Sequence, residues 1–267
     1  MATADLHGTT IWYEIEGDGP PVLVMHGGLG IDHTMYKATL RPLVENHQVI
    51  WYDHRNNGGS GRSDPAAMTM EQLADDAAAL LAHLGLSPAA VFGHSYGGFV
   101  AMELALRHPA SVAGLVLVAT GPGQLGADEV ADEDGVGEPM PDGLLAAFGL
   151  PMSTDDEMRD VMRAVLPFYL HRADPGPLIA VLDDTVMSVE GSARGMEILG
   201  SWSVVDRLHQ IPTPTWVIGG KHDPVMSWPQ QVRIAKRIAG ARLVVLEDAS
   251  HFVWLDAPEE FWAAVNS

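Results

Sequence analysis

Short apolar runs recur along this chain and are separated by segments with helical periodicity. Residues 9–16 alternate between apolar and polar side chains, as in a strand with one buried face. Continuous apolar runs of strand length follow at 21–25, 49–52, 89–92, 115–118, 215–218 and 243–246. A run that is apolar at every position is typical of a strand buried on both faces. The pattern therefore predicts a sheet whose central strands are parallel.

Amphipathic helices are predicted between these strands. Thr69 followed by Gln72 is a capping-box pattern, and it precedes a stretch whose apolar residues share one helical face. Gly85 ends this stretch in the manner of a helix C-cap. Strands that alternate with such helices indicate an α/β fold, with a mostly parallel twisted sheet flanked by helices.

The alternation breaks between residues 121 and 200. Residues 121–141 are rich in glycine, proline and acidic side chains and are typical of a mobile connector. Helices are then expected at about 154–166, 178–189 and 196–208. We therefore predict a core formed by residues 1–120 and 201–267, and a helical cap at 121–200 over the carboxyl end of the sheet.

Composition narrows the class of protein. The 267 residues are 47% hydrophobic, carry a net charge of −20 and include no cysteine. Nucleic acid and anionic membranes are therefore poor partners, and thiolate chemistry is excluded. No apolar run is long enough to span a membrane and no secretory signal is evident, so we expect a cytoplasmic location. No clustered ligand set predicts a metal or another cofactor, and the oligomeric state stays open.

The segment Gly93–Gly98 (GHSYGG) carries the most specific chemical signal. It lies between an apolar strand and a helical stretch, which is the context of a G-x-S-x-G nucleophile elbow. Small flanking residues are needed because the chain approaches itself closely at such a turn. Ser95 is therefore the candidate nucleophile.

A serine hydroxyl needs a base and an acid to activate it. His251 follows the apolar run 243–246, and Asp223 follows the run 215–218. The chain order Ser95, Asp223, His251 is the order of an α/β-hydrolase triad. Of three other histidines, His26 and His94 are expected to be structural, and His222 is expected to be a surface group or a support for Asp223.

Acyl transfer also needs N–H donors for the developing oxyanion. One candidate is the backbone N–H of Tyr96, directly after the nucleophile. The second is the N–H of Gly28 in the loop His26–Gly30 (HGGLG), with Leu29 N–H as the alternative. Glycine in this loop lets the backbone approach a substrate.

These motifs together resemble the α/β-hydrolase-fold serine hydrolases over nearly the whole chain. His26–Gly30 is similar to the H-G-G-P-G loop of the proline iminopeptidase group, with Leu29 where that group has proline. Asp53–Ser60 (DHRNNGGS) is similar to its D-x-R-G-x-G-x-S loop, and Gly219–Pro224 (GGKHDP) resembles the family's acid loop. The resemblance implies the α/β-hydrolase fold with a helical cap inserted after the sixth strand. Esterases and lactonases are relatives of the same kind.

Three functions follow from these observations. The first is a cofactor-independent serine hydrolase that cleaves a small carboxylic ester, lactone or amide through an acyl-enzyme on Ser95. The second is a proline iminopeptidase-type aminopeptidase that binds the substrate ammonium with acidic cap residues, since residues 121–200 hold 16 of the 35 acidic groups. The third is a non-catalytic ligand-binding protein on the same fold, although no triad residue is missing.

Side chains of the cap are the candidates for contact with the substrate. The apolar candidates are Phe148, Met162, Phe168 and Trp202, with Met152 and Tyr169 in the same group. The acidic candidates are Asp155, Asp156, Glu157, Asp183, Asp184, Glu190 and Glu197. Packing inside the cap and solvation explain each of these residues equally well when it is taken alone.

Overall fold

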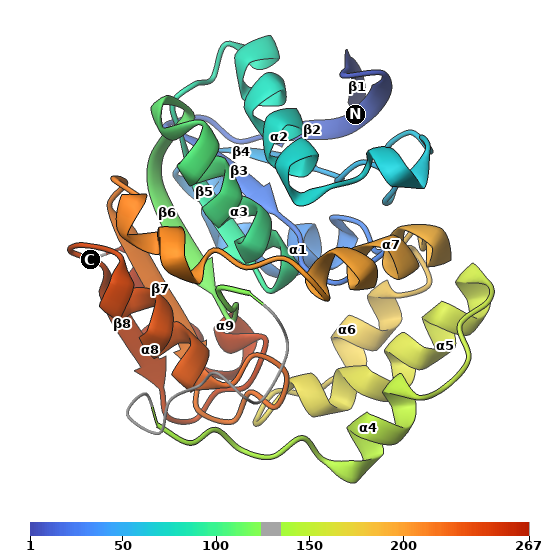
Figure 1. Cartoon of the computed structure of the whole chain (residues 1–267). Coiled ribbons are helices and arrows are strands. Elements are labelled where there is room, and N and C mark those ends of the chain that lie inside the picture. The colour runs from blue at the N-terminus through green and yellow to red at the C-terminus, as the bar shows by residue number, and fades with distance from the viewer. Residues whose placement is uncertain (124–134, 267) are drawn as a thin grey trace.

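A computed structural model describes residues 1–123 and 135–266. Eight strands form one sheet in the order β1-β2-β4-β3-β5-β6-β7-β8 (Figure 1). They are β1 (Ala2–Leu6), β2 (Thr9–Glu16), β3 (Pro21–Met25), β4 (Gln48–Tyr52), β5 (Ala89–His94), β6 (Val112–Val118), β7 (Thr215–Gly220) and β8 (Arg242–Leu246). β2 pairs antiparallel with β1 and β4. The remaining strands, β4, β3, β5, β6, β7 and β8 in their order across the sheet, are parallel to one another. The predicted mostly parallel sheet is confirmed.

Helices cover both faces of this sheet, and side chains of each strand alternate between them. On one face pack α2 (Met70–Leu84), α3 (Tyr96–Arg107) and α8 (Trp228–Arg237). On the other pack α1 (Thr34–Thr39), α9 (Val253–Asp256) and α10 (Pro258–Val265). In β3, for example, Leu23 and Met25 belong to the first core cluster, whereas Val22 and Val24 belong to the second. The two-residue period of a strand therefore supplies two separate hydrophobic cores.

Four further helices are found between β6 and β7 in the part of this segment that the structure describes. They are α4 (Asp142–Phe148), α5 (Asp155–Val165), α6 (Gly176–Val181) and α7 (Val189–Leu199). Figure 1 shows α4, α5 and α6 grouped at one end of the molecule. The expected connector 121–141 falls largely on residues 124–134, which lie outside the described residues. The limits of the cap at 121 and 200 remain a prediction.

Two cap helices differ from the sequence prediction. The helix expected at 178–189 ends at Val181, and the helix expected at 196–208 starts earlier, at Val189. The earlier start of α7 is explained by Ser188, whose hydroxyl accepts the N–H of Gly191 at 3.1 Å and caps the helix. Residues 205–210 form a separate 3-10 turn. The short N-terminal strand β1 was also not predicted.

The caps predicted at Thr69 and Gly85 are confirmed, and the helix expected from residue 154 is capped in the same way. The hydroxyl of Thr69 accepts the N–H of Gln72 at 3.1 Å, and α2 ends at Gly85 with φ 68°. The hydroxyl of Thr154 accepts the N–H of Glu157 at 3.2 Å at the start of α5. These bonds satisfy N–H groups that the first turn of a helix leaves without partners.

Candidate active site

The nucleophile elbow predicted at Ser95 has the expected strained geometry. β5 ends at His94 and α3 begins at Tyr96, and Ser95 between them has φ 51° and ψ −119°. A non-glycine residue rarely adopts a positive φ, and such strain is concentrated at functional sites. The Ser95 backbone is fixed on both sides: its N–H donates to the Val118 carbonyl at 3.0 Å, and its carbonyl accepts the Thr120 hydroxyl at 2.7 Å.

Two glycines make this turn sterically possible. A Cβ at Gly97 would lie 2.1 Å from the carbonyl oxygen of Met25, and a Cβ at Gly93 would lie 2.7 Å from that of Gly97. Contacts this short exclude any side chain at either position. The elbow is thus pressed against the end of β3, where the HGGLG loop starts.

Asp223 and His251 form a buried hydrogen-bonded pair. Oδ2 of Asp223 lies 2.8 Å from Nδ1 of His251, and the two residues are 0% and 2% exposed. The other oxygen, Oδ1, accepts the N–H groups of Val225 and Met226 at 2.8 and 2.9 Å. A carboxylate held in this way keeps the proton on Nδ1, so Nε2 is left as the basic nitrogen. The structure therefore brings together two of the three predicted triad residues.

The loop of His251 also contacts the elbow. Nε2 of His94, the neighbour of Ser95, lies 3.0 Å from the carbonyl oxygen of His251, and the two rings are 4.6 Å apart. Among the described residues, no hydrogen bond joins Ser95 Oγ to the His251 ring. Nucleophile–base bonds are often long before substrate binds and tighten in the complex. The catalytic roles of Ser95, Asp223 and His251 remain predictions.

The HGGLG loop follows β3 and lies beside the elbow. Gly28 and Gly30 have φ 67° and 75°, a region that favours glycine. The cap helix α7 is seated on this loop through small residues. A Cβ at Gly195 would lie 2.6 Å from Leu29 Cδ2, and a Cβ at Gly30 would lie 2.1 Å from the Ser188 carbonyl oxygen. The loop also packs on the elbow, because a Cβ at Gly97 would lie 2.7 Å from the carbonyl oxygen of His26. The predicted oxyanion donors Gly28 and Tyr96 therefore belong to segments that contact each other.

Three buried histidines near the site are neutral and hydrogen-bonded. Burial lowers the pKa of His26 and lowers the pKa values of His54 and His94 well below the usual value. His26 Nε2 accepts the backbone N–H of His54 at 3.1 Å, while Nδ1 of His26 lies 3.0 Å from the Gly27 carbonyl. These contacts fit the structural roles predicted for His26 and His94.

His222, next to Asp223, has partners of its own. Its Nδ1 lies 2.8 Å from Glu138 Oε1, and its ring stacks on that of His171 at 3.7 Å. These contacts agree with the surface or supporting role expected for His222.

The cap contacts the base loop through Tyr169, one of the apolar candidates, and through Asp256, which the sequence did not single out. The Tyr169 ring packs edge-on against the His251 ring at 4.9 Å. The Asp256 carboxylate accepts the N–H groups of His171, Arg172, Ala173 and Ser250 at 2.8–3.0 Å. Its partners are 6 to 85 residues away, so no local sequence signal could have indicated it. Asp256 ties the cap segment 171–173 to the residue before His251.

The four apolar cap candidates lie in different surroundings. Phe148 is 42% exposed, and Met162 and Phe168 pack partly buried among cap residues. Trp202 is buried, and its Nε1 donates to Glu103 at 3.1 Å. Of the six cap residues considered, Tyr169 is the one with a ring contact to His251.

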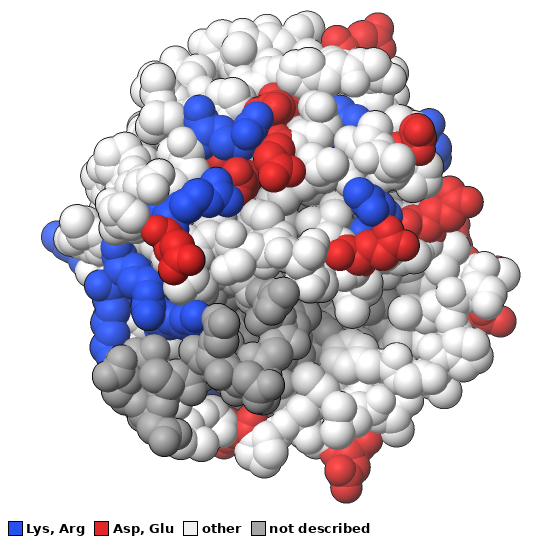
Figure 2. All heavy atoms as spheres, in the orientation of Figure 1, with Lys and Arg blue, Asp and Glu red and all other residues white. Residues whose placement is uncertain are grey.

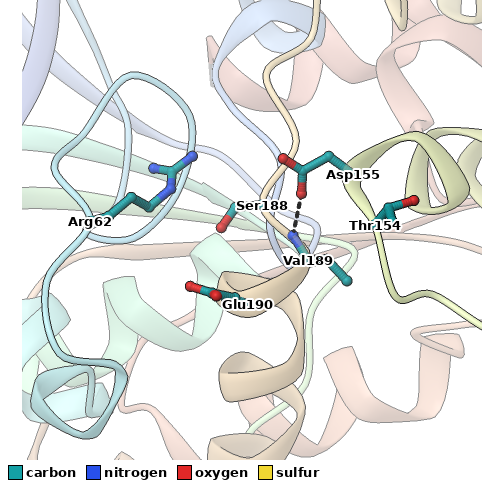
Figure 3. A pocket seen from close by; sticks show the side chains of 6 residues that line it. All are labelled: Arg62, Thr154, Asp155, Ser188, Val189 and Glu190. Atoms are coloured by element: carbon teal, nitrogen blue, oxygen red, sulfur yellow. Dashed lines mark hydrogen bonds between the residues drawn. The ribbon is translucent and has the colours of Figure 1, made fainter.

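Two pockets lie at the seam between core and cap, away from Ser95 and His251. The first encloses about 290 Å³ and is lined by Arg62, Thr154, Asp155, Ser188, Val189 and Glu190 (Figure 3). Figure 3 shows α5 on one side, Arg62 on the other and the start of α7 between them, where Asp155 accepts the Val189 N–H at 2.8 Å. The second, of about 380 Å³, is bordered by α2 and α7. Neither contains a predicted catalytic residue.

Two kinds of site are not found in the part of the chain that the structure describes. Within residues 1–123 and 135–266, no three His, Asp or Glu side chains gather into a group that could hold a metal ion. The same residues include no helix that is long and apolar enough to cross a membrane.

Comparison with known proteins agrees with this geometry. A family model described as the alpha/beta hydrolase fold matches residues 20–147. A relative from Azorhizobium caulinodans, described as a putative carbamate hydrolase RutD, is 39% identical over 94% of this chain and 91% of its own. The chain belongs to the α/β-hydrolase fold family, and it is a hydrolase.

More distant relatives carry several hydrolase names. The proline iminopeptidase PfmaB of Pestalotiopsis fici is 26% identical over 94% of this chain and 93% of its own. The enol-lactonase of Burkholderia xenovorans superposes with a TM-score of 0.79 at 28% identity, covering 99% of this chain and 98% of its own. An esterase from Exiguobacterium antarcticum gives a TM-score of 0.80 at 25% identity, covering 97% and 95%. The predicted fold and the resemblance to esterases, lactonases and iminopeptidases are confirmed.

Proposed function

We propose that this chain is a serine hydrolase in which Ser95 attacks the substrate carbonyl. His251 Nε2 takes the Ser95 proton, and Asp223 stabilises the imidazolium that forms. The observation that carries the proposal is the 2.8 Å bond between Asp223 and His251 Nδ1, in a loop that contacts the elbow of Ser95. The bond fixes the tautomer that a general base needs.

The backbone N–H groups of Gly28 and Tyr96 stabilise the tetrahedral oxyanion, with Leu29 N–H as the alternative to Gly28. His251 then protonates the leaving group, which departs and leaves the acyl group on Ser95. Water, activated by the same imidazole, attacks the acyl-enzyme and restores the free serine. Both half-reactions use the same base and the same oxyanion donors.

The substrate class that we propose is a small carboxylic ester or lactone, with amides as the alternative. Support comes from the esterase and the enol-lactonase, which share this fold over nearly the whole chain. The Tyr169 ring beside His251 adds an aromatic wall to the site. A wall of this kind suits a substrate with an apolar acyl or ring portion.

An iminopeptidase activity has less support from the described residues. It needs a carboxylate near the site to bind the substrate ammonium. All seven acidic cap candidates are exposed. Several already have partners: Asp155 accepts the Val189 N–H, Glu157 the Ser153 N–H, and Glu197 pairs with Arg194. Figure 2 shows acidic side chains along the outer edge formed by α4, α5 and α7.

Carbamate hydrolysis is a second candidate. It is favoured by the relative from Azorhizobium caulinodans, whose similarity extends over 94% of this chain. A carbamate carbonyl carries both an oxygen and a nitrogen substituent, so the same serine attack and the same oxyanion donors serve it.

The first experiment tests the nucleophile. Ser95→Ala is expected to lower the turnover of p-nitrophenyl acetate by at least about 10³-fold, with an unchanged circular dichroism spectrum. Wild-type protein should gain one fluorophosphonate adduct in its intact mass, mapped to Ser95. Ser192→Ala is the matched control, because Ser192 is equally buried at 6% against 7% for Ser95. Full activity of Ser95→Ala would refute the mechanism.

A second experiment separates the substrate classes. Rates would be compared for p-nitrophenyl acetate, a small lactone, an aryl carbamate and proline p-nitroanilide. We expect kcat/KM to be highest for the ester or the lactone. A higher kcat/KM on the proline anilide that disappears on N-acetylation would instead establish the iminopeptidase.

A further inference from the structure

Two buried side chains outside the triad connect the three loops that carry the proposed catalytic groups. The N–H of Gly27 donates to the Tyr36 hydroxyl oxygen at 2.7 Å, and this oxygen lies 2.8 Å from His94 Nδ1. His94 Nε2 in turn lies 3.0 Å from the carbonyl oxygen of His251. We name these three hydrogen bonds the Tyr36–His94 bridge. It joins the loop after β3, the elbow after β5 and the loop after β8.

The direction of every bond in the bridge follows from its chemistry. A carbonyl oxygen only accepts, so His94 Nε2 carries a proton and donates a hydrogen bond to the backbone carbonyl of His251. The ring is neutral because burial lowers the pKa of His94, and Nδ1 is therefore an acceptor. The Tyr36 hydroxyl must then donate to Nδ1, which leaves its lone pairs for the N–H of Gly27. Each polar atom of the bridge thus has one fixed role.

The bridge is closely packed as well as hydrogen-bonded. Tyr36 and His94 are each 1% exposed. The His94 ring contacts the rings of Phe252 and Trp254, with centroids 5.1 and 4.9 Å away. A Cβ at residue 27 would lie 2.6 Å from the Tyr36 hydroxyl and 2.8 Å from the His94 carbonyl oxygen, so a glycine is required there. This packing leaves little freedom for the Gly27 peptide.

We propose that Tyr36 is a positioning residue for the oxyanion hole, acting through the Gly27 peptide. This inference rests on the proposed function, because Gly28, the next residue, supplies one of the proposed oxyanion donors. An oxyanion donor is effective only when its N–H lies close to the position of the developing charge. The Tyr36 hydroxyl holds that segment at a fixed distance from the elbow and from the loop of His251. It contacts neither nucleophile nor base directly.

The variant that tests the proposal is Tyr36→Phe, which removes the hydroxyl and keeps the ring. We expect kcat on p-nitrophenyl acetate to fall by about 10-fold or more, below the 10²–10³-fold typical of deleting an oxyanion donor. KM should change by less than about twofold, since the interaction that weakens is one with the transition state. His94→Gln interrupts the same bridge one bond further on and is expected to lower kcat in the same way.

Tyr52→Phe is the matched control. Tyr52 is also 1% exposed, and its hydroxyl lies 3.0 Å from Nδ1 of a buried histidine, His54. Among the described residues, this hydroxyl makes no hydrogen bond of its own to the Gly27 peptide, the elbow or the His251 loop. It is connected to the His26 carbonyl oxygen through His54, whose Nε2 lies 3.2 Å from that oxygen. Loss of a buried tyrosine–histidine hydrogen bond is therefore common to both variants. Only Tyr36→Phe removes the acceptor of the Gly27 N–H, so it should lower kcat much more than Tyr52→Phe does.

A direct readout of the Gly27 peptide is provided by the sequence itself. Residues 7–8 and 26–27 are the two His-Gly pairs in the chain. Protein labelled with 13C at histidine carbonyls and 15N at glycine should therefore give two correlations in an HNCO spectrum, from Gly8 and Gly27. We expect the Gly27 amide proton to move upfield and exchange faster in Tyr36→Phe. Gly8, at an open turn, should not change.

The proposal is overturned if Tyr36→Phe and His94→Gln keep wild-type kcat, if Tyr52→Phe loses as much, or if the Gly27 signal does not move. Failure of the proposed function gives a different pattern. In that case Ser95→Ala keeps its activity and no fluorophosphonate adduct forms on Ser95, whatever the state of residue 36. The NMR readout reports on the bridge even then, because it does not require turnover.

Discussion

Replacement of Asp256 by asparagine is expected to loosen the cap and destabilise the whole fold. The carboxylate accepts four backbone N–H groups, three from the cap segment 171–173 and one from Ser250, and its side chain is nearly buried. Asparagine keeps one acceptor oxygen but turns an NH₂ group toward these donors. One or two N–H groups then lose their partner: that of Ser250 if the oxygen stays on the side of the cap segment, or those of Arg172 and Ala173 if it faces Ser250.

The size of the effect follows from the cost of each unpaired group. A buried donor without a partner costs about 1–3 kcal/mol, so one or two of them predict a loss of about 1–6 kcal/mol. Each kcal/mol lowers Tm by about 2–4 °C in a domain of this size. The free energy of unfolding would be measured by urea denaturation. Asp248→Asn is the control, because Asp248 pairs with Arg172 at the surface, with side chains 53% and 60% exposed. Exposed pairs of this kind contribute only about 0–1 kcal/mol.

Limited proteolysis tests the local part of the prediction. Trypsin cleaves after Arg172, in the segment that Asp256 holds, and this bond should be cut faster in Asp256→Asn than in the wild type. The kcat should fall as well, because Ser250 precedes His251. The reasoning is refuted if the urea midpoint and the cleavage rate at Arg172 are both unchanged.

Two further predictions follow from the buried groups around the site. His26, His54 and His94 stay neutral in the folded protein but take up protons in the unfolded chain below pH 6.5, so stability should fall as the pH falls through this value. Between pH 7.5 and 5.5 a group that stays neutral costs about 1.4 kcal/mol of stability, so the three groups predict a loss of up to about 4 kcal/mol in urea unfolding; an equal midpoint at both pH values would contradict their neutrality. Gly97→Ala should give protein that is inactive or unfolded, because its Cβ would lie 2.1 Å from a backbone carbonyl. Gly85→Ala, with open space at φ 68°, should lose only about 1–2 kcal/mol and keep its activity.

The parts of the site that the sequence predicted are those with a local signal. The elbow is a six-residue motif, and its context between strand and helix is visible in the apolar pattern. Asp223 and His251 were found because each follows an apolar run, and parallel strands place such residues at one edge of the sheet. The pairing of Asp223 with His251 then confirmed that these two strand ends meet.

The parts that the sequence missed depend on contacts between distant residues. Tyr36 is 58 residues from His94, and Asp256 is 85 residues from His171, so no spacing rule connects them. The cap helices were misplaced for another reason. Apolar residues flank Ser188 on both sides, at Val186, Met187 and Val189, and the capping hydroxyl of Ser188, which starts α7, gives a weaker signal than they do.

The contact between Leu29 and Gly195 has a consequence for engineering this scaffold. Since no side chain at residue 195 separates α7 from the HGGLG loop, the cap and the loop fit each other as a matched pair. A chimaera that receives a cap from a relative must therefore receive that relative's residue at position 29 as well. Exchanging one without the other would leave a void or a clash between α7 and the HGGLG loop, and diversification of substrate range on this scaffold should sample the two positions jointly.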